Sequence, residues 1–64
     1  MKSYSPKEVM KILRLNDWKL DRIKGSHYVF FKEEKRNIVT VFMSKNIVPI
    51  GTLKNIQKQS GIKF

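Results

Sequence analysis

The sequence contains no cysteine, a single histidine (His27) and only five acidic residues among its 64 positions. The lack of cysteine excludes a disulfide framework and a thiolate nucleophile, and it favours a reducing, cytoplasmic location. One histidine and few carboxylates are too few ligands for a zinc site, so neither a metal nor a small-molecule cofactor is implied. No apolar run approaches the ~20 residues of a membrane-spanning helix, and the Lys-bearing start lacks the apolar segment of a signal peptide. We therefore expect no membrane association.

Positive charge is the most prominent feature of the composition. The chain has 14 Lys and Arg against 5 Asp and Glu, a formal net charge of +9. All five acids precede residue 35, and the segment from Lys35 to Phe64 carries six basic residues and no acid. Such a charge attracts polyanions, either nucleic acid or an acidic protein. A purely solubilising role is the alternative, although a net charge of about 2 to 8 suffices for a small domain.

The length allows one domain, residues 1–64, around one small core. Ser5, Pro6 and Glu8 are typical of a helix start, as N-cap, first helical residue and capping-box partner. An apolar stripe then recurs at helical spacing, formed by Val9, Met10 and Leu13. The helix is expected to end near Asn16 and Asp17, which favour turns.

Three strands and a second helix are expected to follow. The strands are predicted at residues 18–24, 27–32 and 37–43, with Trp18 and Leu20 on one face of the first and Ile23 on the other. Short connections favour an antiparallel meander. The last helix follows Gly51 and closes at Gly61 in a left-handed conformation. The predicted fold is α+β, in the order α-β-β-β-α, with two helices on one face of a three-stranded antiparallel sheet, the layout of double-stranded-RNA-binding domains.

The stretch from Lys24 to Phe31 contains the candidate catalytic residue, His27. Gly25 and Ser26 are turn residues, and alternation beyond them puts His27, Val29 and Phe31 on one face. His27 would be the first residue of a strand, open to solvent on one side. By itself, a lone histidine in such a place is more often structural than catalytic.

Several motifs together resemble the HicA family of bacterial toxins. They are Trp18-Lys19-Leu20, the segment from Arg22 to Tyr28 with Gly-Ser-His, the Val-Thr-Val of residues 39–41, Gly51-Thr52-Leu53, and Gln59-Ser60-Gly61-Ile62. The resemblance implies a type II toxin–antitoxin system in which the toxin is an mRNA interferase of double-stranded-RNA-binding-like fold, neutralised by a HicB antitoxin. The histidine of Gly-Ser-His is catalytic in that family, and this role carries over to His27.

The sequence departs from the family pattern after the third strand. Many members have a proline and a second histidine where this chain has Phe42, Met43 and Ser44. A pair of histidines acting as acid and base is therefore excluded. The Asn-Gly-Trp often found before the first strand is Asn16-Asp17-Trp18 here, a change within turn chemistry.

A single imidazole suits RNA cleavage, because RNA carries its own nucleophile in the 2′-hydroxyl and histidine exchanges protons near neutral pH. Phosphate contacts are expected from a turn and three lysines, namely Lys24, Gly25, Ser26, Lys45 and Lys54. Two functions stay open: a metal-independent endoribonuclease toxin, and a non-catalytic RNA-binding module that uses the same basic surface. Surplus apolar residues on the second and third strands suggest a protein partner as well.

Overall fold

The computed structural model describes residues 3–43 and 46–64. Its elements are α1 (Pro6–Leu15), β1 (Lys19–Lys24), β2 (His27–Phe31), β3 (Val39–Phe42) and α2 (Ile50–Ser60). The strands form one antiparallel sheet in the order β1-β2-β3. The predicted α+β fold and its α-β-β-β-α order are confirmed, with strands slightly shorter than expected.

Local signals set the ends of both helices. The Ser5 hydroxyl accepts a hydrogen bond from the Glu8 amide (3.2 Å), and a Glu8 carboxylate oxygen accepts one from the Ser5 amide (2.9 Å). This is the predicted capping box. Gly61 ends α2 with φ 75°, and its amide donates to the Gln57 carbonyl. Neither helix is long and apolar enough to cross a membrane, within the ranges that the structure describes.

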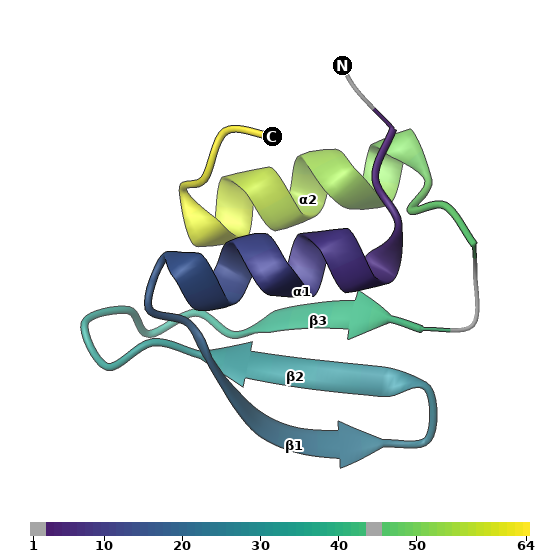
Figure 1. Cartoon of the computed structure of the whole chain (residues 1–64). Helices are drawn as coiled ribbons and strands as arrows, with labels where there is room; N and C mark the ends of the chain where they lie inside the picture. Colours follow the sequence, from purple (N-terminus) through teal and green to yellow (C-terminus); the bar gives the residue numbers. More distant parts are fainter. Residues whose placement is uncertain (1–2, 44–45) are drawn as a thin grey trace.

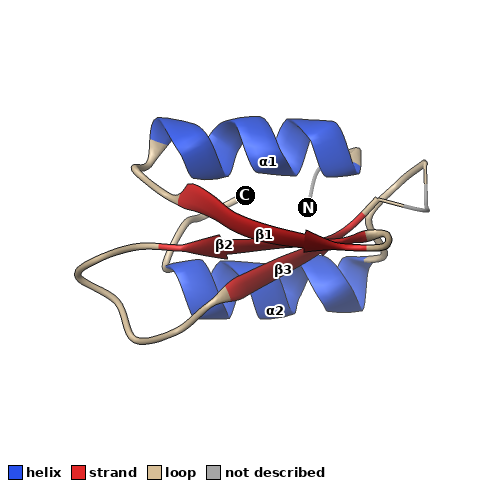
Figure 2. Ribbon diagram, turned by 90° about the horizontal axis from the view of Figure 1, so that it is seen from below, coloured by secondary structure: helices blue, strands red, loops and turns tan. Residues whose placement is uncertain are grey.

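Both helices lie on the β3 side of the sheet, and β1 is the strand farthest from them (Figure 1). In the view from below, β3 projects between α1 and α2 (Figure 2). β3 is accordingly the strand that each helix contacts most. The edge of the sheet at β3 is therefore packed against the helices, whereas the edge at β1 is largely exposed.

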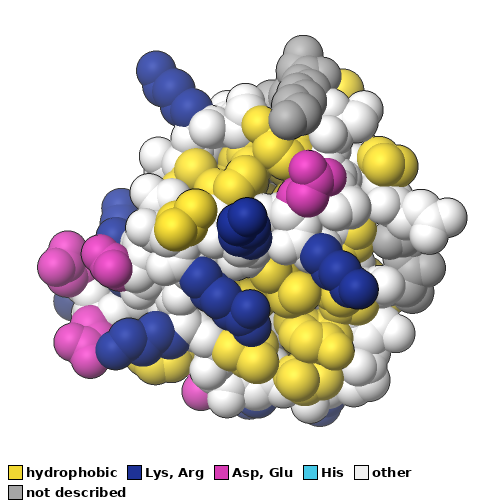
Figure 3. Space-filling view, in the orientation of Figure 1, with side chains coloured by type: hydrophobic (Ala, Val, Ile, Leu, Met, Phe, Trp, Pro, Cys, Tyr) yellow, Lys and Arg dark blue, Asp and Glu magenta, His cyan; other side chains and the backbone are white. Residues whose placement is uncertain are grey.

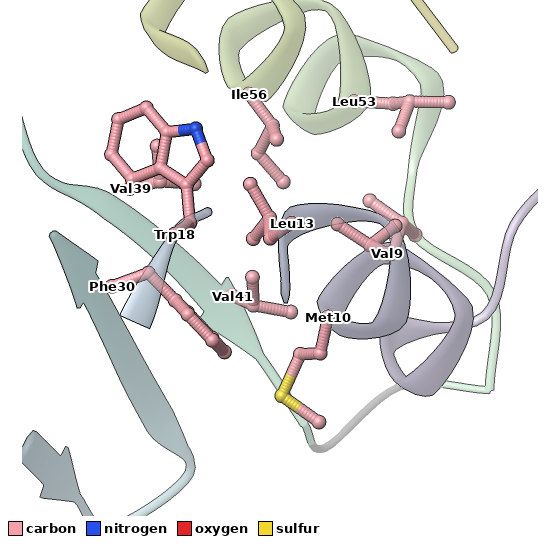
Figure 4. Packing of buried hydrophobic residues seen from close by; sticks show 10 residues of the cluster. Val9, Met10, Leu13, Trp18, Phe30, Val39, Val41, Leu53 and Ile56 are labelled. Carbon is pink, nitrogen blue, oxygen red and sulfur yellow. The ribbon is translucent and has the colours of Figure 1, made fainter. Parts of the chain in front are cut away.

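The core forms on one face of the sheet. Side chains from α1, α2 and β3 converge with Phe30 of β2 (Figure 4). The largest fully buried side chains are Trp18, Phe30, Leu13, Leu53, Ile56, Val9, Val39 and Val41. Each contributes about 1.5 to 3 kcal/mol by leaving water. The indole nitrogen of Trp18 is buried and, among the described residues, has no hydrogen-bond partner.

A β-bulge in β1 corrects one prediction. Leu20 pairs with Phe30 and Arg22 pairs with Val29, so Asp21 is an extra residue in the ladder. The extra residue resets the alternation of side chains. The prediction that Leu20 and Ile23 lie on opposite faces is therefore wrong, because regular alternation ignores such a residue. Both lie on the core side.

The bulge also leaves the three cations of β1 together on one face. Lys19, Arg22 and Lys24 pair with Phe31, Val29 and His27, respectively, and thus lie on the face turned away from the core. We call this the outer face. It comprises Lys19, Arg22 and Lys24 of β1, His27, Val29 and Phe31 of β2, and Thr40 and Phe42 of β3.

Candidate active site and nucleic-acid interface

His27 is the first residue of β2 and is exposed to solvent. It pairs with Lys24 across the hairpin and with Phe42 on β3, so these three residues form one row across the outer face. Its ring meets the Phe42 ring edge-on, with centroids 4.2 Å apart and planes at 81°. Paired side chains on one face lie about 5 Å apart at their Cβ atoms. A cation, an imidazole and an aromatic ring therefore stand side by side.

The turn before His27 has a tight hairpin conformation and is hydrogen-bonded to the residue that follows β3. Gly25 has φ 61°, and Ser26 is not among the residues with positive φ, the pattern of a type II′ hairpin turn. A Cβ built at Gly25 would meet no atom within 4 Å, so its backbone angle rather than crowding favours glycine. The Met43 amide donates a hydrogen bond of 2.9 Å to the Ser26 carbonyl. The end of β3 thereby fixes the turn that positions His27.

The structure brings together most of the predicted site residues. Lys24, Gly25 and Ser26 are exposed and adjoin His27. Lys54 is exposed on α2, but it lies two positions from both Thr52 and Ile56, the residues that face Phe42. Because 3.6 residues complete a helical turn, Lys54 points to another side of α2 and does not join His27. Lys45 lies outside the described residues.

Arg22 was not among the predicted site residues. It lies in the row next to His27, beside Val29 and Thr40, and it is exposed. Its Nε donates to a carboxylate oxygen of Asp21 at 3.1 Å, an exposed pair that contributes little to stability. Its spacing was the available signal, since Arg22 stands two residues before Lys24 and residues i and i+2 of a strand share a face.

A second basic surface lies on α1. Lys7, Lys11 and Arg14 surround the side chains of Met10 and Leu15 there, so blue and yellow groups mix on the face shown in Figure 3. The guanidinium carbon of Arg14 lies 5.9 Å from the centroid of the Phe30 ring. No histidine is visible on this face, so the α1 surface does not include His27 (Figure 3).

Metal ligands do not gather at the outer face. Within residues 3–43 and 46–64 there is no group of three or more His, Asp or Glu side chains placed to hold an ion. The polar groups near His27 are instead cations and backbone amides, which interact with phosphate oxygens.

The element order, the antiparallel sheet and the helix pair are those of double-stranded-RNA-binding domains, here with a cationic face around an exposed histidine. The sequence matches the family model described as HicA toxin of bacterial toxin–antitoxin over residues 6–62, and the chain belongs to this family. The protein thus has the toxin role in a toxin–antitoxin system. A comparison with curated proteins gave no match.

Proposed function

We propose that this toxin is a metal-independent endoribonuclease that cleaves mRNA. His27 is the general base that accepts the proton of the ribose 2′-hydroxyl. The supporting observation is the row in which exposed His27 stands beside Lys24 and rests on Phe42. A general base must reach the hydroxyl of a bound substrate, and this imidazole is open to solvent on a rigid strand.

In the proposed reaction the His27 imidazole takes the proton of a ribose 2′-hydroxyl. The 2′-oxygen forms a bond to phosphorus while the bond from phosphorus to the 5′-oxygen breaks, which leaves a 2′,3′-cyclic phosphate. The leaving 5′-oxygen takes up a proton from solvent, and the His27 imidazolium afterwards returns its proton to solvent. Lys24 and the backbone amides of the turn stabilise the negative charge that builds on the phosphate oxygens. RNA supplies the nucleophile, so one histidine is sufficient for the base step.

A HicB-type antitoxin is the proposed partner. An acidic surface would complement the net charge of +9, and apolar side chains would cover Phe42 and Ile38, which are 46% and 50% exposed. Covering the outer face excludes RNA directly, so inhibition needs no conformational change.

The test is cleavage of a defined mRNA by purified wild-type and His27→Ala protein. We expect the substitution to lower the rate by about 10²- to 10⁴-fold, the usual contribution of a general base. Wild-type activity should persist in a chelator, and the products should carry cyclic or 2′/3′-phosphate ends. Binding of uncleaved RNA is measured in parallel.

A folded His27→Ala protein that cleaves at the wild-type rate would contradict the assignment. If neither protein cleaves but both bind RNA, the second function applies: a non-catalytic RNA-binding module, which the exposed cations of β1 favour. Circular dichroism of both proteins shows whether a loss of activity reflects unfolding.

A further inference from the structure

Cations are unevenly balanced along β1. At its start, Lys19 lines a hollow together with Lys32 and three acids, Asp17, Glu33 and Glu34. This hollow has three carboxylates against two lysines, so its local charge is not positive. At the other end, Arg22 and Lys24 lie beside His27. Asp21, the one acid of the strand, pairs with Arg22 in an exposed contact, and Lys24 has no ion-pair partner among the described residues. The unbalanced positive charge of β1 therefore adjoins the imidazole.

An aromatic ring lies on the other side of the imidazole. Phe42 is 46% exposed and pairs with His27 on the outer face. Beside it is a small apolar hollow lined by Val41, Val48, Pro49, Thr52 and Ile56. An exposed aromatic ring next to a cationic surface is typical of sites that stack nucleobases.

The spacing of these groups fits one nucleotide step. Neighbouring strands are about 4.8 Å apart, so Lys24 and Phe42, on the two outer strands, are separated at the backbone by about 10 Å. A phosphate at β1 and a base at β3 would place the sugar between them, over His27. The ribose 2′-hydroxyl would then face the imidazole.

We propose that the outer face binds single-stranded RNA, with a phosphate held by Arg22 and Lys24 and an unpaired base stacked on Phe42. This inference rests on the proposed ribonuclease function and adds the substrate class and two binding residues to it. A base within a duplex is already stacked and paired, so it does not lie on a protein ring, whereas an unpaired base does. Arg22 lies on this face because it stands two residues before Lys24 in regular register with β2, and the bulge at Asp21 lets Leu20 still face the core.

The first test compares Arg22→Gln with its matched control Lys19→Gln, which removes the same charge from the same strand. Both are made in the His27→Ala background, and fluorescence anisotropy measures binding to a single-stranded oligonucleotide. Each lost phosphate contact lowers the salt slope by about 0.7 for single strands. We expect that reduction and weaker binding for Arg22→Gln, and a nearly unchanged slope for Lys19→Gln. Equal effects of the two substitutions would overturn the phosphate assignment.

The second test concerns the ring. Stacking contributes about 1 to 3 kcal/mol per base, so we expect Phe42→Leu to weaken single-strand binding roughly 5- to 150-fold. Phe42→Trp should restore it, because the new ring also stacks. A loss shared by both variants, or a Phe42→Leu protein that binds like its parent, would overturn the stacking assignment.

A duplex of the same sequence completes the experiment. Tighter binding of the duplex, lost on Lys11→Gln of the α1 surface, would assign RNA to that surface and overturn the inference. The proposed function fails separately, when His27→Ala still cleaves. Arg22→Gln and Phe42→Leu are therefore also made with His27 intact. If the wild type and both of these variants cleave and bind normally, the ribonuclease proposal stays intact and only the single-strand site is removed.

Discussion

The His27 ring meets the Phe42 ring edge-on, with the two ring centroids 4.2 Å apart. The single imidazole of the chain is therefore oriented by an aromatic neighbour on the adjacent strand. Edge-to-face pairs prefer this geometry because the positive edge of one ring meets the negative face of the other. Phe42 therefore has a structural role toward His27 in addition to any contact with RNA.

This contact leads to a stability prediction for His27. We expect His27→Ala to lower the free energy of unfolding by about 0.5 to 1.5 kcal/mol, the usual contribution of an aromatic pair. His27→Phe keeps a ring against Phe42 and should stay near the wild-type stability, while it removes the proton chemistry. Urea denaturation of the three proteins measures the difference. An equal loss in both variants would show that the ring contact is not stabilising.

The basic residues of α2 give a second prediction. Because Lys54 points away from the His27 row, the double substitution Lys54→Gln, Lys58→Gln should weaken RNA binding less than Arg22→Gln alone. Wild-type affinity should still fall steeply with salt, since every neutralised phosphate releases counterions. Anisotropy titrations at several salt concentrations measure both effects. A larger loss for the α2 pair than for Arg22→Gln would move the RNA to that helix.

Occlusion by the antitoxin gives a third prediction. His27 is the only histidine of the chain, so modification of the toxin by diethyl pyrocarbonate at histidine reports on this side chain alone. We expect fast modification of the free toxin and protection in the complex, detected by mass spectrometry of the toxin peptide. The complex should also melt at a higher temperature, because a partner that binds only the folded state stabilises it. Unchanged reactivity in the complex would exclude occlusion.

The buried indole gives a fourth prediction. Trp18 is 2% exposed, and its nitrogen has no hydrogen-bond partner among the described residues. Trp18→Phe removes this unsatisfied group as well as part of the ring, so the two effects oppose each other and we expect a loss below about 2 kcal/mol. Trp18→Ala leaves a large cavity and should cost about 3 to 5 kcal/mol. Thermal denaturation of both variants checks the order.

Much of the fold could be predicted because its signals are local. Ser5, Pro6 and Glu8 determine the start of α1 within four residues, and Gly25 and Gly61 provide the positive φ values that a tight turn and a helix end require. The placement of His27 at the start of β2 followed from the same turn. Each of these depends on neighbours in sequence.

The outer face could not be predicted in full because it depends on pairing between strands. Nothing within residues 19–24 shows that Asp21 is the extra residue of the ladder; the pairing of Leu20 and Arg22 with β2 shows it. The contact of Phe42 with His27 likewise depends on the register between β2 and β3. A loop rather than a tight turn joins these two strands, so no local sequence signal sets that register. Whether Lys54 lies near His27 depends on which side of α2 faces β3, and the sequence of α2 alone does not show this.

One further consequence concerns the free edge of β1. Within residues 3–43 and 46–64 this strand pairs with β2 on one side only, so its other edge presents backbone donors and acceptors to which a second copy of the chain could add a strand. Three cations project from β1, and a bulge interrupts its regular spacing. Both features discourage edge-to-edge pairing, since copies would repel each other and their ladders would not match. Arg22 and Lys24 thus also disfavour the addition of a second copy of the chain to this edge.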